Sequence, residues 1–154
     1  MGLPCPARQC VTNLERAGDE ARKVAKRLRR IHESGETGTI NTTELRKSGE
    51  LALMILRRAL DAFARMGAVA AGQIVRDDEA VDNSFHAFGR RLVMQMTEAP
   101  PTIPVGLEYM FIAKAIERIG DHATNIAEFV VYVVKGRDVR HVSLDRLDKE
   151  VLAN

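Results

Sequence analysis

Three pairs of acidic residues, each separated by four positions, are the part of this sequence best suited to chemistry. The pairs are Glu15 with Asp19, Asp78 with Asp82, and Glu117 with Asp121. Residues four apart lie one turn from each other on the same face of a helix, so each pair presents two carboxylates together. Carboxylate oxygens from facing helices can bind hard or borderline cations, and they can also transfer protons.

The pairs are compatible with a metal site, an acid–base site or a solvated helix face with salt bridges. All three hold the same offset from an apolar stripe, and two of them would converge if their helices packed antiparallel. Four converging carboxylates repel one another unless a cation, protonation or Arg neighbours offset the charge. The pattern therefore favours a metal site at Asp78, Asp82, Glu117 and Asp121.

Two other function classes stay open. A di-metal carboxylate enzyme on a helical bundle normally carries Glu-x-x-His, whereas His122 here directly follows Asp121 and lies five residues after Glu117. A helical interaction module without metal would have Arg or Lys neutralising every carboxylate. Nucleophilic catalysis has no support, because neither cysteine lies beside a His and no G-x-S-x-G occurs.

Apolar residues spaced by alternating steps of three and four predict the helices that carry these acids. We expect a first helix from Thr12 to about residue 33, with Leu14, Ala17, Ala21, Val24, Leu28 and Ile31 inward. A second helix is predicted to about residue 66, a short one over 68–76, a third to about 97 and a fourth over 107–136. Short connections between them predict an all-α fold, an antiparallel three-helix bundle with one additional N-terminal helix.

Composition excludes several function classes. The 154 residues are 45% hydrophobic and 29% charged with a net charge of +2, which argues against a nucleic-acid binder. No uncharged stretch is long enough to span a bilayer, and no export signal is visible, so we expect a cytoplasmic protein with reduced cysteines. The basic residues after Ala21 are interpreted as a solvated face, with an acidic partner or anionic lipid as the alternative.

An internal sequence repeat points to a resemblance between this chain and a known protein family. The pattern E-R-x-G-D occurs at 15–19 and again at 117–121. The run FIAKAIERIGDHATNIAEFVVYVVKGRDVRH closely resembles the signature helix and tail of the PhoU family, and TNLERAGDEARKVAKRL resembles the matching helix of that family's first repeat. The segments ILRRALDAFARM, VRDDEAVDNSF and EAPPTI are similar to the second repeat in the expected order. The resemblance covers about residues 11 to 150.

The resemblance implies a cytoplasmic negative regulator of phosphate uptake and phosphate-starvation signalling, without enzymatic activity. Such a protein acts between a phosphate ABC transporter and a sensor histidine kinase, meets the membrane only through these partners, and often forms a homodimer. It also implies a bound metal ion or cluster, with iron as the candidate. The positions that match the family's metal motifs are Asp78, Asp82, Glu117 and Asp121, with Glu15, Asp19, Asp61 and Asn125 as further candidates.

The chain departs from the family pattern at its start, where two long helices are missing. We therefore expect an irregular leader over 1–10, the last helix of a truncated first repeat over 11–36, a complete second repeat over 41–137 and a polar tail over 138–154. The missing helices would leave an apolar side of the first helix uncovered. That uncovered side motivates the expectation of a homodimer.

Overall fold

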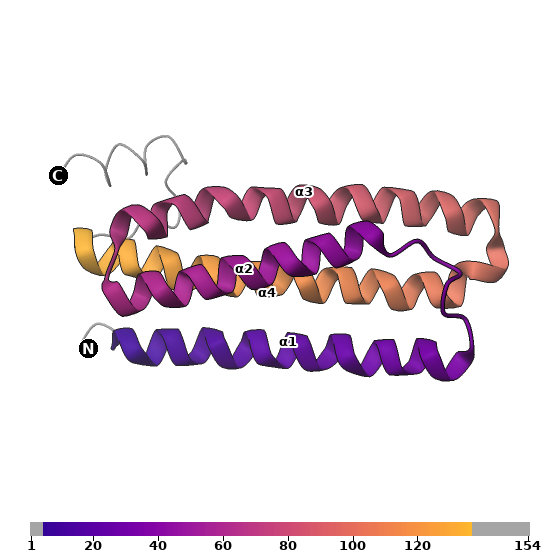
Figure 1. Ribbon diagram of the computed structural model, residues 1–154, viewed down its shortest axis with the longest axis horizontal. Coiled ribbons are helices and arrows are strands. Elements are labelled where there is room, and N and C mark those ends of the chain that lie inside the picture. Colours follow the sequence, from indigo (N-terminus) through magenta and orange to yellow (C-terminus); the bar gives the residue numbers. More distant parts are fainter. Residues whose placement is uncertain (1–4, 137–154) are drawn as a thin grey trace.

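A computed structural model describes residues 5–136 as four long α-helices and one short 3₁₀ helix (Figure 1). In chain order they are α1 (Pro6–Ser34), α2 (Thr43–Arg65), α3 (Ala68–Glu98), η1 (Pro100–Thr102) and α4 (Ile103–Lys135). No strand occurs within residues 5–136, and the all-α prediction is confirmed. The predicted tail over 138–154 lies outside the described residues.

Helices α2, α3 and α4 pack against one another as the predicted three-helix bundle, in which consecutive helices run in opposite directions (Figure 1). Helix α4 is the most deeply buried, because it contacts all three other helices. Helix α1 runs antiparallel to α4 along one edge and makes no comparable contact with α2 or α3. The architecture is therefore a bundle with one helix attached through α4.

Two apolar clusters hold these helices together. One is built around Ile55, Ile74 and Ile126, and α1 adds Cys10 to it. The other contains Phe88 and Ile112, among others, and α1 adds Ile31 to it. Each cluster joins α2, α3 and α4, and α1 is fixed near both of its ends. In α2 and α3 most buried residues recur at steps of three and four, so each of these helices buries one continuous apolar stripe, as the spacing of apolar residues in a packed helix predicts.

Helix boundaries differ from the predicted ones at two places where a helix begins with proline in its first turn. Helix α1 begins at Pro6, so the expected irregular leader is wrong for residues 6–10, and Thr12, where this helix was expected to begin, is an interior residue. Helix α4 begins at Ile103 and includes Pro104 in its first turn. Proline is well tolerated there, because the first N–H groups of a helix have no intrahelical acceptor.

The segments predicted as a short helix over 68–76 and a separate third helix are one continuous helix, α3. The chain turns just before it, where Met66 adopts a left-handed conformation with φ of 50°. The acidic run that follows Arg76 does not interrupt α3. This run is Asp77, Asp78 and Glu79, and because the residues are consecutive in a helix, their carboxylates point in three different directions.

The register of α1 also differs from the prediction. Leu14, Ala21 and Leu28 were expected inward, but all three are exposed. The face that packs on α4 lies one position earlier and carries buried Asn13 and Glu20. The buried residues of α1 are Cys10, Asn13, Ala17, Glu20 and Ile31.

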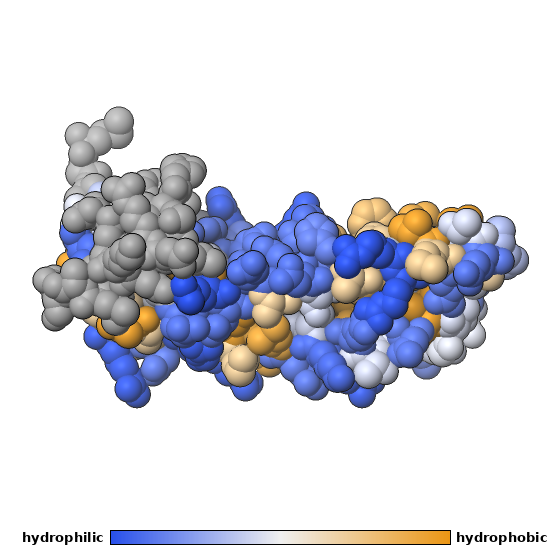
Figure 2. Space-filling model, turned by 90° about the horizontal axis from the view of Figure 1, so that it is seen from above, coloured by the Kyte–Doolittle hydropathy of each residue, from blue (hydrophilic) through white to orange (hydrophobic). Residues whose placement is uncertain are grey.

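Figure 2 shows the side of the molecule on which α3 lies, with α1 on the far side. Most of this surface is hydrophilic, and apolar side chains gather toward the end where α3 leads through η1 into α4. Among residues 5–136, no helix combines the length and apolar character needed to cross a bilayer.

Candidate metal centre

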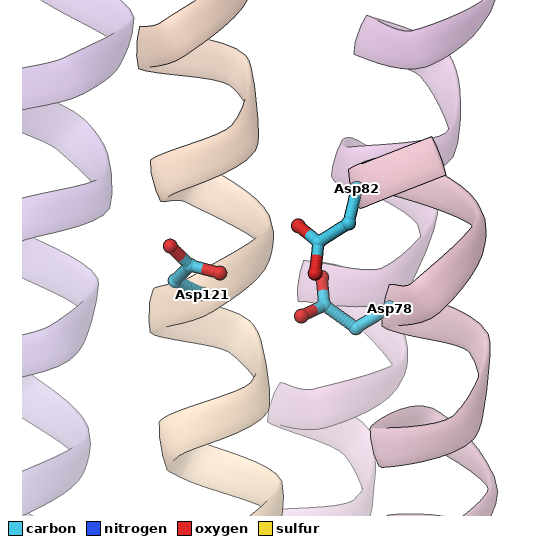
Figure 3. A group of neighbouring side chains, drawn as sticks. All are labelled: Asp78, Asp82 and Asp121. Carbon is cyan, nitrogen blue, oxygen red and sulfur yellow. The ribbon is translucent and has the colours of Figure 1, made fainter. Parts of the chain in front are cut away.

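Three aspartates meet between α3 and α4. Asp78 and Asp82 project from successive turns of α3, and Asp121 projects toward them from α4 (Figure 3). One carboxylate oxygen from each lies within 4.8 Å of the others. This spacing allows a single cation to contact all three side chains. The structure therefore unites three of the four residues predicted as metal ligands.

Asp78 is the innermost member of this group. It is 8% exposed, and its Oδ1 is buried without a hydrogen-bond partner in the described part of the chain. The Thr124 hydroxyl beside it is buried too and makes no hydrogen bond of good geometry within residues 5–136. Buried polar atoms without partners are rare and costly. The side chains of Asp78 and Thr124 nevertheless interact with each other, so the observation that points to an additional ligand is the buried Asp78 oxygen beside the converging aspartates.

Gly120 explains how Asp78 approaches α4 so closely. A Cβ at this position would lie 2.6 Å from Asp78 Oδ1, which is too close for any real contact. The glycine of the second E-R-x-G-D motif therefore makes room for the carboxylate. Gly18, its counterpart in the first motif, has nothing within 4 Å of an added Cβ. The two copies of the motif thus have different surroundings.

Burial and mutual repulsion raise the pKa of all three carboxyl groups, so each keeps its proton to a higher pH than an ordinary aspartate. Burial, followed by the negative charge of Asp82, raises the pKa of Asp78 from 3.8 to about 7, while an interaction with the Thr124 side chain opposes the rise. Burial followed by the charge of Glu117 raises the pKa of Asp82. Burial followed by the charge of Asp82 raises the pKa of Asp121. A bound cation would relieve the same repulsion without protonation.

Glu117, the fourth predicted ligand, lies at the edge of the centre. Its side chain is largely buried and accepts a hydrogen bond of 2.9 Å from the Lys114 ammonium group. Its charge still reaches the aspartates, since it raises the pKa of each of them. Glu117 therefore adds negative potential to the centre, and Lys114 partly offsets it.

The remaining predicted candidates point elsewhere. Glu15 and Asp19 are exposed on α1, where Arg22 lies 3.9 Å from Asp19. Asp61 on α2 pairs with Arg65 at 3.2 Å. Asn125 donates a hydrogen bond of 3.2 Å to Asn13 of α1. None of these contacts involves the three aspartates.

His122 faces α1 and not the carboxylates. Its Nδ1 lies 3.2 Å from Asn13 Oδ1, and burial, followed by the charge of Arg16, lowers its pKa. The side chains of the centre therefore offer oxygen donors. Such a donor set suits Mg²⁺, Ca²⁺, Mn²⁺ or iron, and lacks the imidazole that the di-metal enzymes with Glu-x-x-His use.

Sequence reasoning missed Gly120 and Thr124 as parts of the centre. The glycine did have a signal, because it is fixed within the repeated E-R-x-G-D pattern. Thr124 lies one turn after Gly120 on α4, on the side of the helix that meets Asp78. Its hydroxyl had no sequence signal that distinguishes it from other threonines.

The chain is similar in sequence to a known domain family and to named bacterial proteins. Residues 45–130 match the PhoU domain family. The chain is 47% identical over 143 residues to a phosphate-specific transport system accessory protein PhoU homolog from Burkholderia sp, covering 92% of this chain and 61% of that protein. It is 40% identical over 140 residues to the corresponding PhoU protein of Escherichia coli (strain K12), covering 90% of this chain and 57% of that one.

The crystal structure of PhoU from Pseudomonas aeruginosa superposes with a TM-score of 0.81 at 40% identity, over 85% of this chain and 62% of the other. The chain thus spans about 60% of the length of these relatives. The match of sequence and fold confirms the resemblance found in the sequence. This chain belongs to the PhoU domain family.

Proposed function

We propose that this chain takes part in the regulation of phosphate uptake and of phosphate-starvation signalling. The observation that carries the proposal is its 40–47% identity, over nearly its whole length, to proteins named phosphate-specific transport system accessory proteins. The relatives are longer, and this chain contains the bundle of α2, α3 and α4 with the carboxylate centre.

The proposal assigns metal binding to the carboxylate centre. Asp78, Asp82 and Asp121 would hold the cation, with Glu117 supplying further negative charge from its edge. Support comes from the partnerless Asp78 Oδ1, from the close approach at Gly120 and from the all-oxygen donor set. A cation or cluster, with iron as the candidate, would offset the repulsion between α3 and α4 and so stiffen the bundle. The centre is in this view structural or modulating, and no catalytic step is assigned to it.

The finer parts of the proposal concern partners. The chain would act in the cytoplasm as a negative regulator, an adaptor between a phosphate ABC transporter and a sensor histidine kinase. It would reach the membrane through these partners alone and would form a homodimer. The names of the relatives support association with a phosphate transport system, and the helical bundle offers long surfaces for such contacts.

A reporter assay tests the regulatory role. The chain is expressed in bacteria that lack their own PhoU protein, and a phosphate-starvation reporter is measured at high external phosphate. We expect the wild-type chain to lower the reporter signal, and Asp78→Asn with Asp121→Asn to abolish this effect. Asp61→Asn, on the exposed surface of α2, is the matched control and should behave as wild type. A wild-type chain that is folded and abundant but leaves the reporter unchanged would contradict the proposed role.

A further inference from the structure

Lys114 is a positive charge built into the edge of the carboxylate centre. It lies on the same side of α4 as Glu117 and Asp121, which follow it by one and two turns of the helix. Its ammonium group donates a hydrogen bond of 2.9 Å to Glu117 Oε1. Burial dominates the raised pKa values of Asp82 and Asp121, and the charge of Lys114 opposes both rises. The ammonium group therefore acts on the aspartates as well as on its direct partner.

The ammonium group also holds the Glu117 carboxylate in place. The Glu117 side chain is 13% exposed, and it borders a small apolar cavity that Val81, Phe85 and Phe88 help to line. A carboxylate in such surroundings keeps its charge at least cost beside a cation, and a charge-assisted hydrogen bond is stronger than a neutral one. Glu117 is thereby drawn toward Lys114, and its oxygen atoms lie outside the group that the three aspartates form.

Formal charge indicates what the Lys114 ammonium group does to cation binding. When ionised, Glu117 and the three aspartates carry four negative charges. One divalent cation and the ammonium group supply three positive charges, whereas two divalent cations and the ammonium group would supply five. A second cation would also need the Glu117 oxygens, because the first engages the aspartates. Lys114 thus opposes a second cation by repulsion and by occupying the ligand that this cation needs.

We infer that Lys114 limits the carboxylate centre to one divalent cation by keeping Glu117 out of the coordination shell. Because this role rests on the proposed metal binding, it also decides between the single cation and the cluster considered there. The ammonium group has a second position within reach, since Lys114 Nζ lies 5.2 Å from the centre of the Phe85 ring, in the range of a cation–π contact. The Lys114 side chain is 43% exposed, so it can leave Glu117 while the bundle stays folded. Glu117 is a reserve ligand that is released when Lys114 moves.

Manganese binding to the chelator-treated, full 154-residue chain tests the role of Lys114. Mn²⁺ is the probe because it accepts oxygen ligands, and its electron paramagnetic resonance signal counts free ions and reports coupling between neighbouring bound ions. We expect one bound ion in the wild type. Lys114→Met nearly keeps the length of the side chain and removes its charge. This variant should bind two spin-coupled ions and hold the first about tenfold more tightly.

Lys23→Met is the matched control. Lys23 also lies three residues from a glutamate on its own helix, and its ammonium group is 3.0 Å from Glu20 Oε1. This substitution removes the same charge at a place outside the carboxylate centre, so it should leave one bound ion with unchanged affinity. Circular dichroism checks that the helices of both methionine variants are intact. A second ion in both variants would show that overall charge governs binding, and would overturn the inference.

A further pair of variants tests the part given to Glu117. In Lys114→Met with Glu117→Gln the second ion loses its ligand, so we expect one bound ion again. Glu117→Gln alone should weaken the first ion about tenfold, because Lys114 without its partner moves toward Asp82 and Asp121. Two ions bound by the wild type, or two bound by the double variant, would overturn the inference.

The number of bound ions separates the role of Lys114 from the metal centre itself. One ion in the wild type and one in Lys114→Met would refute the role of Lys114 and leave the metal centre in place. No bound ion in any of these proteins would refute the metal centre, and the role of Lys114 with it.

Discussion

The metal-free protein should become more stable as the pH falls from about 8 to about 5, because folding holds Asp78 in its protonated form. The pKa of Asp78 is about 7 in the folded chain and 3.8 for an ordinary aspartate. The folded state therefore binds a proton in a pH range where the unfolded state does not. The resulting stability is fully present below the unfolded pKa and is lost as the pH rises through the folded pKa.

The magnitude follows from the size of this shift. Each pH unit between the two pKa values changes the free energy of unfolding by about 1.4 kcal/mol, so the change between about pH 7 and pH 5 is about 2.7 kcal/mol. Asp82 and Asp121, whose pKa values are also raised, act in the same direction. His122 acts in the opposite direction. Its pKa is lowered, so its contribution is present above its unfolded pKa and is lost as the pH falls.

Urea denaturation of chelator-treated wild type and Asp78→Asn at several pH values separates these effects. His122 is present in both proteins, so the difference between their two pH profiles reports Asp78. Relative to wild type, Asp78→Asn should gain about 2.7 kcal/mol in free energy of unfolding when the pH rises from 5 to about 8. Adding a divalent cation at the higher pH should stabilise wild type and leave Asp78→Asn largely unaffected. Parallel pH profiles for the two proteins would refute the reasoning.

Four further substitutions test the packing. Gly120→Ala should displace the Asp78 carboxylate and weaken cation binding at least tenfold, because the new Cβ would lie 2.6 Å from Asp78 Oδ1; Gly18→Ala, with nothing within 4 Å, should be neutral or stabilise by up to ~1 kcal/mol. Equal cation affinities in the two alanine variants would contradict the role given to Gly120. Ile126→Ala should cost about 2–5 kcal/mol in urea denaturation, because Ile126 is 1% exposed in the core; a cost below ~1 kcal/mol would be inconsistent with that burial. Met66→Gly should raise stability by about 1 kcal/mol, because Met66 has a φ of 50°; a lower melting temperature would count against strain at that turn.

The bundle could be predicted from the sequence because its helices each have one apolar face. In α4 the isoleucines at 112, 116 and 126 recur along one face and are buried, whereas Val133, which continues the same stripe, is 37% exposed. Helix boundaries were harder to predict, since proline both breaks helices and begins them. Whether Pro6 and Pro104 do the one or the other depends on where the preceding chain lies.

The register of α1 could not be derived from its pattern, because this helix has two faces able to pack. One carries Leu14 and Leu28, and the other carries Asn13 and Glu20 among small apolar residues. Pattern analysis prefers the larger apolar side chains. The structure uses the other face, since Asn13 accepts a hydrogen bond from Asn125 and Arg118 lies 3.9 Å from Glu20. Such polar matches depend on the partner helix and are invisible in the isolated segment.

The candidate centre was partly predictable for a related reason. Spacing placed Asp78 with Asp82 on α3 and Asp121 on α4, and an antiparallel bundle brings them together. Spacing alone could not show that Glu117 pairs with Lys114 at 2.9 Å or that Gly120 makes room for Asp78. These features depend on the distance between two helices.

Metal content measured by elemental analysis, on protein purified without chelators, tests the central claim most directly. Three proteins are compared: wild type, Asp78→Ala with Asp121→Ala, and Glu15→Ala with Asp19→Ala as the matched pair on the exposed face of α1. We predict stoichiometric metal in wild type and in the α1 variant, and its loss in the variant of the carboxylate centre. Metal that persists without Asp78 and Asp121, or wild-type protein that binds none even when divalent cations and iron are supplied, would contradict the account.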